Sequence, residues 1–177
     1  TGIEAFFKLK DKSSLIIGNS KFIVLGNKVA FDFHLDENKL EILNSKLRNN
    51  NISLSFDSVL DFNPYFDMKT AINIDSINKK IINHVNLKKI LEKKEFIQKI
   101  NNEGQINYNP KKINRNFIKN YNSNFTVSYG RLSFNNETSL SGGKVICKGD
   151  SILIEKYPKL NFYCSIKIED RNIFLKT

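Results

Sequence analysis

Few residues of this chain have the types and the spacing that catalysis or metal binding requires. His34 and His84 are the only histidines, and neither has a companion Cys or Asp at metal-ligand spacing. Ser53 and Ser55 have no nearby base, and the sequence holds no phosphate-binding glycine loop, serine-hydrolase elbow or zinc-protease motif. We therefore expect a protein that is not an enzyme and has no catalytic residue, no metal and no cofactor.

Aspartates recur on the polar phase of the segments expected to be strands, at Asp57, Asp61, Asp67 and Asp75. Two of them could approach one another across a hairpin, as the paired carboxylates of a glycosidase do. The same alternation of polar and apolar residues also predicts each of them as an ordinary surface residue, and that is the interpretation we adopt.

Cys147 and Cys164 are the only cysteines. Cys164 falls within residues 160–168 on the same phase as the apolar residues, which favours a buried free thiol. A disulfide is the alternative, because the two residues could lie on neighbouring strands in an oxidising compartment.

The formal net charge of +10 could indicate a nucleic acid or an anionic membrane surface as partner. Lys, Asn and Ile are abundant throughout and Trp is absent, a composition typical of AT-rich coding sequences, so we attribute the charge to composition. Phe and Tyr share their faces with Ile, Leu and Val rather than with cations, which does not suit base stacking. We expect no nucleic acid partner, and a basic nucleic-acid-binding module is kept as an alternative.

The elements that must position any site are strands, because apolar and polar residues alternate with a period of two. The alternation is clearest over residues 29–36, 51–62 and 66–75, and short polar turns separate these segments. Strands with one apolar face and short connections predict an antiparallel meander.

We expect a single domain over residues 1–177, with strands over 1–75 and over 123–177, the last of them at 171–176. A short helical insertion is expected near residues 76–120, with a short strand at 105–109 inside it. Gly130 interrupts the alternation of residues 123–134, which suggests a β-bulge. The predicted fold class is mainly β, or β-rich α+β: a curled antiparallel meander with an apolar inner face. No stretch approaches the roughly 20 apolar residues of a membrane span, and we expect the chain to be a piece of a longer protein.

Two passages resemble periplasmic segments of the AsmA-like proteins. The passage from Leu54 to Asp67, leading into Ile72 to Asn78, is similar to the family's order of strand, loop, Pro-aromatic pair, strand and helix. The passage from Glu155 to Phe162 is the second likeness. The resemblance extends over much of the chain through loose patterns and not through a catalytic signature.

AsmA-like proteins are anchored in the inner membrane of Gram-negative bacteria and take part in phospholipid transport and outer-membrane biogenesis. The resemblance implies a non-enzymatic periplasmic segment that forms an apolar groove for phospholipid acyl chains, held at the inner membrane by an anchor outside this sequence. A closed β-sandwich with a structural or assembly role is the alternative. The residues expected to line the groove are Val29, Phe31, Phe33, Leu35, Ile52, Leu54, Phe56, Phe66, Met68, Ile72, Ile74, Phe125, Val127, Tyr129, Phe162, Cys164 and Ile166.

Overall fold

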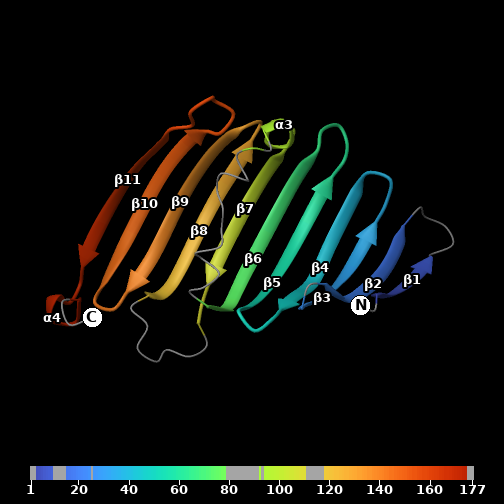
Figure 1. Ribbon diagram of the computed structural model, residues 1–177, viewed down its shortest axis with the longest axis horizontal. Coiled ribbons are helices and arrows are strands. Elements are labelled where there is room, and N and C mark those ends of the chain that lie inside the picture. Colours follow the sequence, from blue (N-terminus) through green and yellow to red (C-terminus); the bar gives the residue numbers. More distant parts are fainter. Residues whose placement is uncertain are drawn as a thin grey trace.

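The computed structural model describes residues 3–9, 15–24, 26–78, 92, 94–110 and 118–174. Its strands form one sheet of 11 strands, which lie side by side in the order of the sequence (Figure 1). The elements are β1 (Ile3–Leu9), β2 (Ile16–Val24), β3 (Asn27–Leu35), β4 (Lys39–Arg48), β5 (Ile52–Asp61), β6 (Asp67–Ile77), α3 (Lys94–Ile97), β7 (Asn101–Tyr108), β8 (Ile118–Ser128), β9 (Arg131–Leu140), β10 (Gly143–Ile152), β11 (Leu160–Ile168) and α4 (Arg171–Phe174).

The predicted fold class is confirmed at its coarser level: the chain is mainly β, and its sheet is a largely antiparallel meander. Only β6 and β7 pair in parallel among the described strands, and residues 78–100 connect them. The expected curl is wrong, because the sheet is open and is neither closed nor strongly curled (Figure 1). Alternation determines which face is apolar, whereas curvature depends on bulges and glycine kinks that a period of two does not report.

The closed sandwich considered as an alternative is also not observed. All described strands belong to the same sheet, so the strand blocks before and after residue 78 lie edge to edge. A sandwich would require them to pack face to face.

The helical insertion expected over residues 76–120 is largely wrong in the part that the structure describes. β6 continues to Ile77, β8 begins at Ile118, and the only described helix between them is α3. The short strand expected at 105–109 is confirmed as part of β7, which begins earlier, at Asn101. Residues 79–91, 93 and 111–117 lie outside the described residues, so the helical spacing predicted there is not tested.

Two local predictions near the C-terminal strands are wrong for identifiable reasons. Tyr129 and Gly130 both have positive φ, of 47° and 87°, and they form the two-residue turn between β8 and β9 and not a bulge. Paired positive φ values are typical of the tight hairpin turns that match strand twist. The strand expected over 171–176 begins instead as α4, where the Asp170 side chain accepts hydrogen bonds from the backbone N–H groups of Asn172 and Ile173.

Three register shifts keep the apolar residues on one face along the whole sheet. β4 carries an extra residue relative to both neighbours around Asn44, which has a positive φ of 52°. The backbone N–H of Asn44 donates to Asp57, and its side-chain amide donates to Asp32. The other shifts fall at Asp75 in β6 and next to Lys119 in β8. Each extra residue changes the parity of the strand that carries it.

Large side chains cover glycines on the apolar face. Gly104 in β7 lies directly opposite Phe125 in β8, and a Cβ atom at Gly104 would come within 2.0 Å of the Phe125 ring. Gly149 in β10 is related to Phe134 in β9 in the same way, at 2.6 Å. An aromatic ring that lies over a glycine on the neighbouring strand compensates for the missing side chain.

This arrangement predicts a specific coupling between Gly104 and Phe125. Gly104→Ala should lower the free energy of unfolding by about 1–3 kcal/mol, because the methyl group overpacks against the ring. In the Phe125→Ala background the same change should cost clearly less, and urea denaturation of the four proteins measures the difference. Additive effects of the two changes would contradict the contact.

Candidate functional site

The apolar face predicted from the sequence exists and crosses the sheet from β2 to β11. Residues directly opposite each other on paired strands present their side chains on the same face. One such row shows how continuous this face is, because it is apolar at nearly every strand: Phe22, Val29, Leu47, Leu54, Ile74, Tyr108, Tyr121, Thr138, Val145 and Ile166.

The registers bring most of the predicted groove residues together on this face. The fifteen that lie within strands share it: Val29, Phe31, Phe33, Leu35, Ile52, Leu54, Phe56, Met68, Ile72, Ile74, Phe125, Val127, Phe162, Cys164 and Ile166. Phe66 precedes β6, and Tyr129 lies in the turn after β8, so these two lie outside the strands; both are exposed.

The most buried polar side chains lie on the same face, and sequence reasoning missed them. Ser20, Ser45, Ser58, Ser123 and Ser151 are all buried, and each has a large residue as a register partner; Phe31 lies opposite Ser20, and Phe56 lies opposite Ser45. The sequence feature that could have identified them is their spacing, because each serine lies an even number of residues from apolar residues of its own strand. Small residues beside large ones let a single layer of side chains pack closely.

Apolar side chains are most exposed along β11, the strand at the C-terminal edge. All nine of its residues are exposed, and Phe162 and Ile166 on the apolar face keep 65% and 63% of their surface accessible. Large apolar side chains exposed side by side mark interaction surfaces in soluble proteins.

The prediction that Cys164 is a buried free thiol is wrong, because Cys147 and Cys164 form a disulfide. The two residues are register partners on β10 and β11, with their Cα atoms 4.1 Å apart. The bond therefore fixes the edge strand to its neighbour, and Cys164 offers no thiol to the apolar face.

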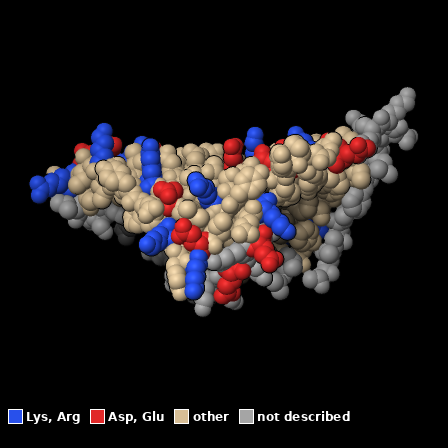
Figure 2. Space-filling view, turned by 90° about the horizontal axis from the view of Figure 1, so that it is seen from above, with Lys and Arg blue, Asp and Glu red and all other residues tan. Residues whose placement is uncertain are grey.

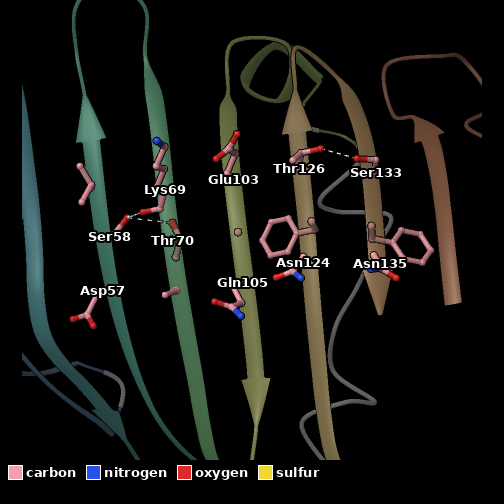
Figure 3. Close-up of a pocket in the computed structure, with 15 residues that line it drawn as sticks. Asp57, Ser58, Lys69, Thr70, Glu103, Gln105, Asn124, Thr126, Ser133 and Asn135 are labelled. Atoms are coloured by element: carbon pink, nitrogen blue, oxygen red, sulfur yellow. Dashed lines mark hydrogen bonds between the residues drawn. The ribbon is translucent and has the colours of Figure 1, made fainter. Parts of the chain in front are cut away.

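The polar face carries a hollow of about 680 Å³ at the centre of the sheet, over β5 to β9 (Figure 3). Two rows of polar-face side chains line it: Asp57, Ala71, Gln105, Asn124 and Asn135 form one, and Val59, Lys69, Glu103, Thr126 and Ser133 form the other. The hydroxyls of Thr126 and Ser133 are hydrogen-bonded at 2.6 Å. The hollow offers amide and hydroxyl groups for hydrogen bonding, but its lining contains no histidine or cysteine.

His34 lies on the polar face, as predicted, opposite Glu41 on β4. Its Nδ1 atom is 3.3 Å from one carboxylate oxygen of Glu41, and the Lys39 ammonium is 2.6 Å from the other. The hydrogen bond from Lys39 lowers the pKa of the Glu41 carboxyl and raises the pKa of Lys39. This half-exposed network contains no nucleophile, and it links two neighbouring strands at the surface. His84 lies outside the described residues.

The aspartates singled out in the sequence also have structural partners. Asp61 and Asp67 are register partners across the β5–β6 hairpin, and the Asn101 side chain donates a hydrogen bond of 2.8 Å to Asp67. Asp57 holds the bulge at Asn44, and Asp75 forms the bulge in β6. In the described part of the chain, no group of three His, Cys, Asp or Glu residues could hold a metal ion.

Charges of both signs are mixed at the end of the strands seen in Figure 2, where Lys and Arg lie among Asp and Glu. This mixing does not resemble the continuous basic stripe of a nucleic-acid interface. None of the helices in the described residues is long and apolar enough to span a membrane.

The disulfide predicts a measurable stabilisation of the C-terminal edge. Replacing both cysteines by serine should lower the free energy of unfolding by about 3 kcal/mol, because the bond closes a loop with a sequence separation of 17 residues. Denaturation of the oxidised protein, the reduced protein and the double variant measures this effect. Equal stability of the three forms would contradict it.

No protein-family model matches this chain, and neither the curated proteins nor the solved structures contain a match.

Proposed function

We propose that the apolar face of this sheet shields the acyl chains of phospholipids, as part of a non-enzymatic protein of the bacterial envelope. The observation that carries the proposal is a continuous apolar face from β2 to β11, over which the described residues place no second sheet. Soluble monomers rarely leave such a face without a partner.

The chemistry of the face suits an aliphatic ligand better than an aromatic or polar one. Its side chains are mainly Ile, Leu, Val and Phe, and the serines among them lie buried at the base of the layer. The hydroxyl of Ser58, for example, is already hydrogen-bonded to the Thr70 hydroxyl and to the Lys69 carbonyl. An acyl chain on this face would leave the hydrogen bonds of Ser58 intact, whereas the Ser45 hydroxyl is buried without a hydrogen-bond partner.

The energetics require only modest contact. Removing each methylene from water is worth about 0.8 kcal/mol, so a few methylenes per chain would hold a lipid without a specific polar contact. Contacts of this kind discriminate poorly between acyl chains and allow release, as a transport surface requires.

The location that we propose is the periplasm, with attachment to the inner membrane through a segment outside this sequence. The Cys147–Cys164 disulfide supports an oxidising compartment, since such bonds are rare in the bacterial cytosol. The resemblance to the AsmA-like proteins supports the same location and a role in phospholipid transport and outer-membrane biogenesis. The curled groove that the resemblance implies is not observed, so the surface that we propose for acyl chains is the apolar face of an open sheet.

The test is lipid binding by variants of the exposed edge strand. Phe162→Lys combined with Ile166→Lys places two charges on the apolar face of β11, where both side chains are exposed and the fold should tolerate them. We expect binding of a fluorescent phospholipid to fall at least tenfold, because a charge beside an acyl chain must be desolvated. Native mass spectrometry of the purified protein should also detect bound phospholipid in the unmodified chain.

Tyr163→Lys combined with Ser165→Lys is the matched control, because it adds the same charge to the same strand on the polar face. This control should bind lipid as the unmodified protein does. Equal loss in both double variants, or a purified protein that neither carries nor binds phospholipid, would refute the proposal.

A further inference from the structure

A second hollow, of about 460 Å³, lies on the polar face over β2, β3 and β4. Four cations surround it: Lys21, Lys28, Lys46 and Arg48. They belong to two cross-strand rows, in which Lys21 and Lys46 flank Ala30, and Lys28 lies between Ile23 and Arg48. All four side chains are exposed, and the small Ala30 leaves the space between them open.

The register places like charges next to each other here, which is unfavourable for the sheet itself. Lys28 and Arg48 are directly opposite on neighbouring strands, where Cβ atoms are about 5 Å apart and like charges destabilise the pairing. Like charges also lie opposite each other at Lys144 and Lys167 and at Asp61 and Asp67. One member of each of those pairs has a partner, because Lys144 forms an ion pair with Glu137 and Asp67 accepts a hydrogen bond from Asn101. The pair of Lys28 and Arg48 differs, because neither side chain has an ion-pair partner in the described part of the chain.

None of the four cations forms an ion pair with a side chain that the structure describes. The nearest described carboxylate along β3 is that of Asp32, which accepts a hydrogen bond from the Asn44 side chain at the bulge. Glu4 occupies the register position opposite Lys21 on β1. Even with Asp32 counted, cations predominate among the described side chains around the hollow.

The backbone around the hollow is held in place by its own contacts. The Asn49 side chain donates a hydrogen bond of 2.6 Å to Asn27, which connects the end of β4 to the start of β3 next to Arg48 and Lys28. The Lys and Arg side chains thus extend from a fixed platform of three paired strands. A preorganised set of donors loses less entropy when it binds an anion.

We propose that this hollow, which we call the cationic hollow, binds a phosphate group that carries two or more negative charges. Such an anion would bridge Lys28 and Arg48 and remove their repulsion, and the Arg48 guanidinium can donate two parallel hydrogen bonds to phosphate oxygens. The phosphate belongs either to a soluble oligophosphate or to a lipid headgroup, since both present the same chemistry. The cationic hollow lies on the face opposite the acyl-binding face, so it does not depend on the function proposed above.

The experiment measures binding of tripolyphosphate by calorimetry, and binding of vesicles of phosphatidylglycerol or phosphatidylcholine by sedimentation. We expect the full chain to bind tripolyphosphate or the anionic vesicles in a salt-sensitive manner, and Lys28→Gln combined with Arg48→Gln to weaken that binding at least tenfold. Binding of tripolyphosphate alone identifies a soluble ligand, and binding of the anionic vesicles alone identifies a headgroup.

Lys148→Gln combined with Lys159→Gln is the control, because it removes two exposed cations far along the sheet, in and after β10. It should leave binding unchanged, and the Lys28/Arg48 variant should unfold at the same temperature as the unmodified chain or a higher one, since a repulsive pair is lost.

Equal weakening in both double variants, absence of binding to either probe, or tighter binding to a short single-stranded DNA would overturn the proposal. The Phe162/Ile166 variant should bind the probe normally, which separates this site from the acyl-binding face.

Discussion

The structure depends on keeping the apolar residues of every strand on the same face of the sheet. A slip of one residue in any strand pairing would turn the apolar side chains of that strand to the polar face. The sequence changes phase where the structure inserts a residue: in β4 the apolar positions are Leu40 and Ile42 before Asn44, and Leu47 after it. The positive φ of Asn44 and its hydrogen bonds to Asp32 and Asp57 fix that insertion. Two carboxylates that seem to be ordinary surface groups therefore maintain the alignment of three strands.

A sheet that stacks on no second sheet among the described residues must obtain its packing within a single layer of side chains. Buried apolar residues are accordingly few, and only Ile97 and Leu140 among the described residues are buried to that degree. The sheet compensates by placing serines and glycines beside large neighbours, as with Ser45 beside Phe56 and Gly104 beneath Phe125. Packing within a single layer leaves much of the apolar surface half-exposed, and this surface is the reason to consider an aliphatic ligand.

Alternation in the sequence was sufficient to predict most strands and the face on which residues such as Phe33 and Ile72 lie, because a period of two determines that face directly. The short connections predicted the antiparallel pairing, which holds for all the described pairs except the parallel pair of β6 and β7. It could not predict that the sheet stays open, since closure depends on how the edge strands pair. The turn at Tyr129 and Gly130 resembled a bulge because a turn and a bulge both interrupt the alternation of apolar and polar residues along the sequence. The cationic hollow could not be predicted for another reason. Lys21, Lys28 and Arg48 look like separate surface residues in the sequence, and only the register between β2, β3 and β4 makes them neighbours.

The parallel pairing of β6 with β7 has a consequence for how the chain folds. The other neighbouring strands are joined by connections shorter than residues 78–100, so their contacts are local and the entropy lost on loop closure is small. The molecule thus consists of two meanders of low contact order, β1–β6 and β7–β11, and each can form before the other is complete. They join through the β6–β7 ladder and through side-chain hydrogen bonds from Asn101 to Asp67 and from Asn107 to Asn73. Because residues 78–100 make the largest loop to close, we expect this pairing to form last, so that unfolding along the reverse route breaks it first. Partial unfolding would accordingly divide the sheet in its middle and expose two new strand edges there.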